Sequence, residues 1–300
     1  MSVMKANKQS LDEKTEKTVS ASSEIHSLLQ AKEYQTGSGT IRYWVDRSAG
    51  EQAPWIFFLP GLTADHTLFA TQMPHFSGRA NCIVWDAPAH RESRPYPLDF
   101  TMDDYARFVR DILEMEGATK PVLVGQSLGG YVGQCFMELF PGLAGGFISI
   151  DSAPLQRSYM KGWEIWMLKH TKLMYLSIPW KLLVVWACKG VACTQTGQDN
   201  MREMMESYSK VEYCSLAAHG YRMLADAIEA DRPYHINCPA LIMCGEYDQA
   251  ASTKRYNKVW AERSSLPFIW IPNAGHNSTL DNPSFVNEQI EQFLAQLKVD

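Results

Sequence analysis

Short, continuous runs of apolar residues recur along the chain, and turn-forming residues bound each of them. The runs are rich in β-branched and aromatic residues and do not alternate with polar positions. This pattern is typical of strands that are buried on both faces of a parallel sheet. The six runs cover residues 56–59, 82–85, 122–124, 147–150, 241–244 and 268–271.

Segments with helical spacing lie between several of these runs. Residues 101–117 begin with Thr101, a favourable N-cap, and carry acidic residues in the first turn. Residues 282–297 begin with Asn282 as the N-cap and Pro283 at the first helical position. The alternation of strands and helices predicts an α/β fold, with a mostly parallel central sheet flanked by helices.

The segment 152–231 interrupts this alternation. It is rich in Met, Trp, Tyr and Leu at helical spacing and contains no convincing strand. We therefore predict a helical cap inserted into a core domain of residues 24–151 and 232–300. An antiparallel hairpin over residues 31–46 is expected near the start of the core. Residues 1–23 are polar and lack the apolar segment of a secretory signal, so we expect a poorly ordered extension there.

The 300 residues are 46% hydrophobic and carry a net charge of −5, which fits one α/β domain with an insertion. Lys and Arg form no block, so nucleic acid is not expected as a partner. No run reaches the roughly 18 apolar residues of a transmembrane helix, so we expect no stable membrane insertion. The seven cysteines lie mostly in apolar runs, which favours free thiols in a reducing cytoplasm.

The strongest chemical signal is the stretch VLVGQSLGGYVGQ, which places Ser127 in a G-x-S-x-G pattern. An apolar strand precedes the serine and a helical segment follows it, and this context gives the pattern its meaning. A sharp turn holds such a serine in a strained conformation, so its neighbours Gly125 and Gly129 need almost no side chain. A serine that merely caps a helix needs no glycine on both sides. Ser127 is therefore the candidate nucleophile.

A serine hydroxyl needs a base to act as a nucleophile at neutral pH. His276 lies in the loop after the last apolar run, at the same end of the sheet as Ser127. The histidine in turn needs an acceptor that orients it. Asp248 follows the preceding strand and is the preferred candidate, Asp151 is its rival, and Glu246 is a third choice.

The elbow GQSLGG at 125–130, the acid loop GEYD at 245–248 and the loop NAGH at 273–276 occur in the order and spacing of a known family. On these motifs the chain, over about residues 36–300, resembles α/β-hydrolase-fold serine hydrolases of the esterase, lipase and lactonase group with a helical cap. The resemblance implies a catalytic triad of Ser127, His276 and Asp248, and a small-molecule acyl substrate. It implies neither a cofactor nor a metal.

The resemblance also implies an oxyanion hole made by the backbone N–H groups of Leu62 and Leu128. The family usually has a histidine at the position of Pro60, where the fixed φ of proline can brace the loop instead. A second departure lies in DAPAHRES, because the family commonly has D-x-P-G-x-G-x-S. Ala89 and Arg91 replace those glycines here, which affects the local geometry rather than the chemistry.

His66 and His90 flank the expected mouth of the site, and we expect both to be loop histidines that touch solvent. Candidate substrate contacts are Gln126, His66, Trp163 and Trp166. The aromatic and Met-rich cap favours an apolar or aromatic acyl substrate over a highly charged one. An equally good interpretation is that these cap residues form the cap's own core.

The sequence thus predicts a serine hydrolase that cleaves a carboxylic ester or related acyl substrate through an acyl-enzyme on Ser127. One alternative is a ligand-binding or signalling protein that keeps the fold with little turnover. Others are carbon–carbon hydrolysis, acyl transfer and perhydrolysis by the same triad. An aspartate-nucleophile epoxide hydrolase is disfavoured because residue 127 is serine. Cys188 and Cys193 have no nearby pair of histidines, so a zinc site is not expected.

Overall fold

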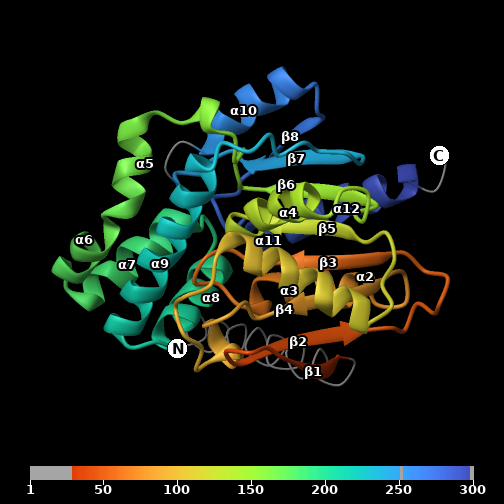
Figure 1. Ribbon diagram of the computed structural model, residues 1–300, viewed down its shortest axis with the longest axis horizontal. Helices are drawn as coiled ribbons and strands as arrows, with labels where there is room; N and C mark the ends of the chain where they lie inside the picture. The colour runs from red at the N-terminus through yellow and green to blue at the C-terminus, as the bar shows by residue number, and fades with distance from the viewer. Residues whose placement is uncertain (1–28, 251–252, 298–300) are drawn as a thin grey trace, which may run out of the picture.

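The computed structural model describes residues 29–250 and 253–297, which contain one eight-stranded sheet (Figure 1). The strands are β1 (Gln30–Gln35), β2 (Thr40–Asp46), β3 (Trp55–Leu59), β4 (Asn81–Trp85), β5 (Val122–Gln126), β6 (Gly146–Ile150), β7 (Ala240–Gly245) and β8 (Phe268–Ile271). Their order in the sheet is β1-β2-β4-β3-β5-β6-β7-β8. β1 and β2 form an antiparallel hairpin and β2 is antiparallel to β4, whereas all pairs from β4 to β8 are parallel.

The predicted α/β sheet is confirmed, because each of the six apolar runs lies within a strand. The strands from β3 to β7 are buried at every position, as their continuous apolar sequences require. The predicted hairpin is confirmed as well. Its turn is closed by Thr36, whose N–H donates to the Gly39 carbonyl at 2.8 Å.

Helices cover both faces of the sheet. Those of the core are α2 (Gln72–Phe76), α3 (Met102–Met115), α4 (Leu128–Leu139), α10 (Thr253–Ser264), α11 (Ser278–Asp281) and α12 (Pro283–Leu297). α3 and α4 pack together on the face toward the viewer in Figure 1, and α2 packs with α12 behind it. Both predicted N-caps are confirmed. Thr101 and Asp104 form a capping box, and the Asn282 side chain accepts the Phe285 N–H at 3.3 Å.

Five helices between β6 and β7 form the outer end of the molecule, on the left in Figure 1. They are α5 (Gly162–Lys169), α6 (Thr171–Ser177), α7 (Trp180–Val191), α8 (Gln195–Glu206) and α9 (Lys210–Glu229). α5 and α6 pack on α9, and α7 packs on α8. The segment is helical, as expected. Its limits as a separate cap stay a prediction, and the predicted extension of residues 1–23 lies outside the described residues.

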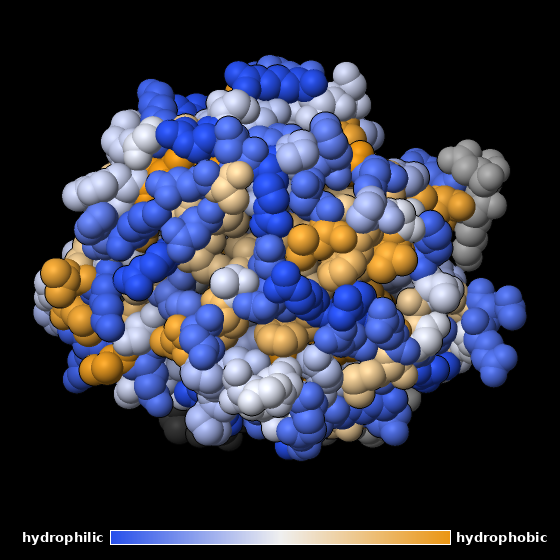
Figure 2. All heavy atoms as spheres, in the orientation of Figure 1, coloured by the Kyte–Doolittle hydropathy of each residue, from blue (hydrophilic) through white to orange (hydrophobic). Residues whose placement is uncertain are grey.

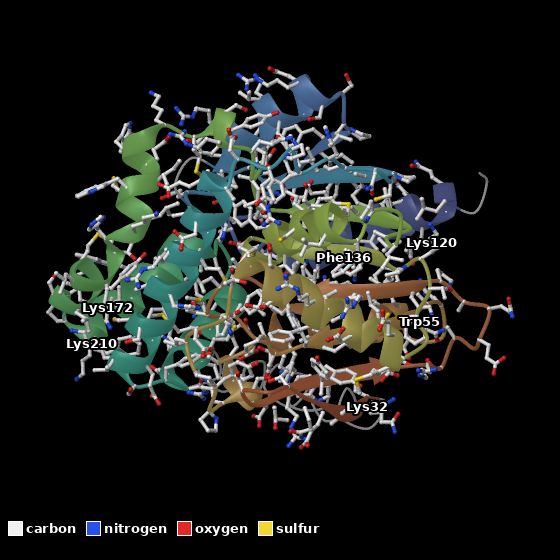
Figure 3. All side chains as sticks on the ribbon, viewed as in Figure 1. Lys32, Trp55, Lys120, Phe136, Lys172 and Lys210 are labelled. Atoms are coloured by element: carbon white, nitrogen blue, oxygen red, sulfur yellow. The ribbon has the colours of Figure 1, made fainter. Side chains whose placement is uncertain are left out.

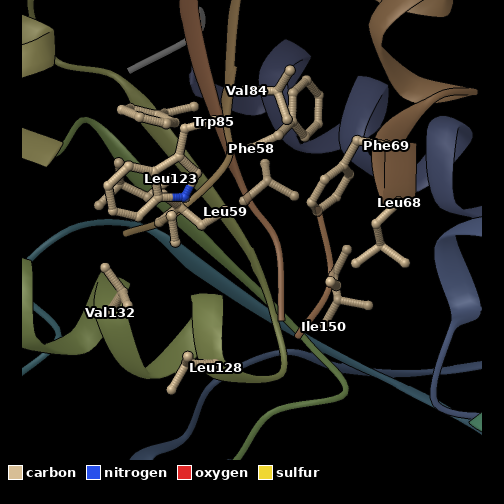
Figure 4. Close-up of a cluster of buried hydrophobic side chains, with 14 of the residues drawn as sticks. Phe58, Leu59, Leu68, Phe69, Val84, Trp85, Leu123, Leu128, Val132 and Ile150 are labelled. Carbon is tan, nitrogen blue, oxygen red and sulfur yellow. The ribbon is translucent and has the colours of Figure 1, made fainter. Parts of the chain in front are cut away.

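The core is a layer of aromatic and aliphatic side chains between the sheet and its helices (Figure 4). The Phe58 and Phe69 rings lie 4.9 Å apart, and Trp85 meets Tyr105 edge to face at 5.6 Å. Each such buried side chain contributes about 1.5–3 kcal/mol relative to exposure. This packing fixes the ends of the strands, where the polar loops begin. Among the described residues, no helix combines the length and apolar character needed to cross a bilayer.

Candidate active site

Ser127 occupies the turn between β5 and α4, in a conformation that few non-glycine residues adopt. Its φ is 51° and its ψ is −115°, a strained region that costs on the order of 1–3 kcal/mol. The turn is tight because α4 starts directly against β3. A Cβ on Gly129 would lie 1.9 Å from the Leu59 carbonyl oxygen, so only glycine fits there. The Ser127 N–H is held by the Ile150 carbonyl of β6 at 2.9 Å.

His276 and Asp248 complete a hydrogen-bonded chain with Ser127. His276 Nε2 lies 2.9 Å from Ser127 Oγ, and His276 Nδ1 lies 2.9 Å from Asp248 Oδ2. The loops after β5, β7 and β8 supply the three side chains, because the carboxyl ends of parallel strands meet at one edge of a sheet. The Asp248 carboxylate is fully buried, and its second oxygen accepts the Ala250 N–H at 2.7 Å.

The surroundings of His276 favour its protonated form. Burial lowers the pKa of the imidazole, but the negative charge and hydrogen bond of Asp248, with the charge of Asp151, outweigh burial and leave the pKa raised. The ring therefore takes a proton more readily than a free histidine does. Its Nε2 faces the Ser127 hydroxyl, whose proton such a base would take.

Asp151, the rival acid, makes a different set of contacts. One oxygen accepts the Gly245 N–H at 2.7 Å, and the other accepts the Ser278 hydroxyl. Burial, followed by the nearby charge of Asp248, raises the pKa of Asp151 to about 7. Asp151 thus ties the end of β7 to the helix after the His276 loop. The third choice, Glu246, is exposed and accepts the Asn273 N–H at 3.1 Å.

The loop after β3 passes directly against the nucleophile. A Cβ on Gly61 would lie 3.1 Å from the Cβ of Ser127 and 2.4 Å from the Gln126 side chain. Within the described residues, the N–H groups of Leu62 and Leu128 have no hydrogen-bond acceptor. Two backbone donors without an acceptor therefore lie near Ser127, one in the loop after β3 and one at the start of α4.

His90 holds this loop in place, which the sequence did not predict. Its ring is completely buried rather than touching solvent, so that expectation is wrong. Nε2 accepts the Thr63 N–H at 3.0 Å, and Nδ1 donates to the Pro88 carbonyl at 2.9 Å, since a carbonyl can only accept. Burial lowers the pKa of His90 to about 4, so the ring is neutral at physiological pH. No local sequence signal marks this contact, because it joins two loops 27 residues apart.

The loop after β4 keeps a glycine-like backbone without its glycines. Ala89 has a φ of 65° and Arg91 a φ of 29°, both in the left-handed region. The Asp86 carboxylate accepts the N–H groups of His66 and Glu92 at 2.8 and 2.9 Å, which holds the loop closed. Ala89 and Arg91 therefore adopt the left-handed backbone that glycine favours.

The candidate substrate contacts fall into two groups. Gln126 is buried beside the triad and donates to the His276 carbonyl at 2.7 Å. His66 is mostly buried too, against the Trp44 ring at 3.8 Å and the Asp86 carboxylate at 2.9 Å. Trp163 and Trp166 instead lie on the surface of α5, 58% and 61% exposed. A substrate contact by any of the four stays a prediction.

Two groups of side chains have metal-ligating atoms close together. They are Asp65, His66 and Asp86, and the group Asp151, Cys244 and Asp248. Their carboxylates already accept hydrogen bonds from neighbouring N–H and O–H groups, so neither group needs a cation to satisfy its charge. The absence of a metal and of a cofactor from the reaction stays a prediction.

Residues 56–289 match the model of the alpha/beta hydrolase family, and the chain belongs to this family. No protein of curated function matches it in sequence. Several solved structures share the fold at low identity. The Cif epoxide hydrolase from Acinetobacter nosocomialis is 18% identical, with a TM-score of 0.75 and 89% of each chain covered.

Two further structures with this fold are an esterase and a lactonase. The thermophilic esterase from Thermogutta terrifontis is 21% identical, with a TM-score of 0.71 over 89% of this chain and 99% of that one. The enol-lactonase from Burkholderia xenovorans LB400 is 16% identical, with a TM-score of 0.71 over 88% of this chain and 100% of that one. At these identities the similarity establishes the fold alone.

Proposed function

We propose that the protein is a serine hydrolase that cleaves a carboxylic ester, or a related acyl compound, of a small apolar or aromatic molecule. The observation that carries this proposal is the unbroken chain of hydrogen bonds from Ser127 through His276 to Asp248. Two proteins of the same fold are, by their names, an esterase and an enol-lactonase. The free, mostly buried cysteines fit a cytoplasmic enzyme.

The proposed reaction begins when Ser127 Oγ attacks the acyl carbon and passes its proton to His276 Nε2. Asp248 keeps the other ring proton on Nδ1 and stabilises the imidazolium. The N–H groups of Leu62 and Leu128 donate to the oxyanion of the tetrahedral intermediate. His276 then gives its proton to the leaving alcohol, and water resolves the acyl-enzyme by the reverse order of steps.

His90 and Gln126 are positioning residues in this proposal, because neither needs to touch the substrate. His90 holds Thr63, the residue after the proposed donor Leu62. Gln126 holds the backbone of His276. Pro60 therefore does not leave the loop without a brace, since a histidine from the next loop supplies one.

The decisive test combines turnover with labelling. A series of p-nitrophenyl esters of increasing acyl length is compared between the wild type and Ser127→Ala, which should lose at least about 10⁴-fold in kcat/KM while keeping its circular dichroism. A fluorophosphonate should label the wild type at Ser127 and leave the variant unlabelled. Equal turnover by both proteins would remove Ser127 from the mechanism. A wild type that is neither labelled nor active would favour the ligand-binding alternative.

A further inference from the structure

Three cap helices expose an unusual amount of apolar surface. Fourteen large apolar side chains of the described residues are exposed, and eight of them lie on α5, α6 and α7. The eight are Trp163, Trp166, Met167, Leu173, Met174, Leu182, Val185 and Trp186. We call these eight side chains, together with the exposed lysines Lys161, Lys172, Lys181 and Lys189, the cap face. Monomeric proteins rarely cluster apolar surface in this way without a partner.

On α5 and α7 the apolar side chains follow the outer side of the helix. On α7, Leu182, Val185 and Trp186 share one side at helical spacing, whereas Leu183 and Val184 are buried on the other. α5 repeats the pattern, with only Ile165 buried. A surface helix ordinarily turns polar side chains outward. These helices are apolar on both sides, as expected when the outer side meets a second apolar phase.

The same helices are basic although the whole chain is acidic. Residues 160–191 contain five lysines and one acidic residue, Glu164, in a chain of net charge −5. Glu164 pairs with Arg255 at 3.1 Å. Lys161, Lys172, Lys181 and Lys189 are exposed and form no ion pair within the described part of the chain.

The figures place these features at one end of the molecule. Figure 2 shows apolar side chains gathered at the outer end, over α6. Lys172 and Lys210 lie at that same end in Figure 3, far from Lys120 at the opposite end of the sheet. Lys172 therefore lies at the same end of the molecule as the apolar side chains over α6.

We propose that the cap face docks on an anionic lipid bilayer. Indole rings favour the interface between headgroups and acyl chains, and Leu and Met side chains enter the apolar region below it. Lysines around them attract anionic headgroups, while their long stems remain in apolar surroundings. Docking of this kind needs no spanning helix. A second copy of the chain fits less well, because a two-fold contact would set the lysines of one face against those of the other.

The docked helix reaches the proposed site. The carbonyl of Val191, at the end of α7, accepts the Asn277 N–H at 2.7 Å, directly after His276. α7, which carries part of the cap face, is thus connected by one hydrogen bond to the loop that carries His276, the proposed base. This part rests on the proposed function, and it implies that esters carried in an anionic bilayer are the substrates that docking favours.

Binding is tested first with Ser127→Ala, so that the result does not depend on catalysis. The full chain is floated with vesicles of phosphatidylcholine, alone or with about 30 mol % phosphatidylglycerol. It should bind the anionic vesicles, with binding that weakens as salt rises. Lys172→Glu with Lys181→Glu should lower the partition coefficient by about tenfold or more. Leu173→Gln with Trp186→Gln should lower it at least as much.

Matched controls lie at the opposite end of the sheet. Lys120→Glu makes half the charge change of the double lysine variant, and Leu143→Gln removes an exposed leucine there, so neither should alter binding. The proposal is overturned if the wild type does not bind anionic vesicles, or if the cap-face variants and the control variants bind them equally well. It is also overturned if the cap face proves to hold two copies together in light scattering.

Activity separates the two proposals. The cap-face variants should hydrolyse a soluble short-chain ester as the wild type does, and should lose about tenfold on an ester embedded in anionic vesicles. Loss on both esters would contradict a docking role. An inactive wild type that still binds anionic vesicles would refute the proposed function and leave docking intact.

Discussion

The strand ends and the cap face differ in which side chains they bury: the strand ends bury polar side chains, whereas the cap face exposes apolar ones. At the strand ends, charged and polar side chains such as Asp86, His90 and Asp151 are fully buried and hydrogen-bonded to backbone groups. On α7, side chains such as Leu182 and Trp186 are exposed. The first region is thus organised by contacts within the chain. The second has apolar surface whose partner lies outside it, so its substitutions should matter for binding rather than for folding or chemistry.

The largest effect is expected for Asp248, one of the two buried aspartates around His276. Asp248→Asn should lower kcat by about 10³–10⁴-fold, because it removes the charge that stabilises the imidazolium. Asp151→Asn keeps the contact with the Gly245 N–H and should cost less than about tenfold in kcat, since the triad geometry is preserved. Steady-state kinetics on one soluble ester checks both. A larger loss for Asp151→Asn would make Asp151 the triad acid.

Two adjacent leucines of α7 test the difference between the regions inside one helix. Leu183 is 5% exposed and Leu182 is 39% exposed. Leu183→Ala should lower the free energy of unfolding by about 2–4 kcal/mol, since it leaves a cavity. Leu182→Ala should change it by less than about 0.5 kcal/mol. Urea unfolding followed by fluorescence measures both, and equal losses would show that the outer side of α7 is packed like the inner one.

His90 tests whether the buried polar contacts serve the chemistry. His90→Leu leaves the Thr63 N–H buried without an acceptor, which costs about 1–3 kcal/mol of stability. It should also lower kcat by about tenfold with KM nearly unchanged, because an oxyanion donor acts mainly in the transition state. His90→Gln offers a new acceptor and should recover part of kcat. A loss of stability with unchanged kcat would limit His90 to a structural role.

The pH dependence gives the smallest effect. Because the pKa of His276 is raised above the ordinary 6.5, the base is protonated and inactive below that raised value. The acidic limb of kcat/KM should therefore lie above pH 6.5, and Asp248→Asn should move it down. The same shift stabilises the fold below pH 6.5, and this contribution is lost as the pH rises through the folded-state pKa. A limb at or below pH 6.5 in the wild type would contradict the raised pKa.

Several features of the site could be predicted from sequence because their causes are local. The strained serine turn needs glycine on both sides, so Gly125, Ser127 and Gly129 form a recognisable pattern. The cap residue Thr101 is likewise followed by its partner Asp104 three positions later. Features that join distant segments could not be predicted from the sequence. His90 has no pattern of its own, since its role depends on Thr63 in another loop.

The sequence by itself determined the parallel sheet, the position of the nucleophile turn and the short set of histidine and acid candidates, because apolar runs and turn residues act over a few neighbours. Only the tertiary structure decided which acid contacts His276, that a buried histidine braces the loop after β3, and that Trp163, Trp166 and Trp186 are exposed. Those outcomes depend on which segments meet in space. Contact between segments is set by packing over the whole chain, which no short stretch of sequence encodes.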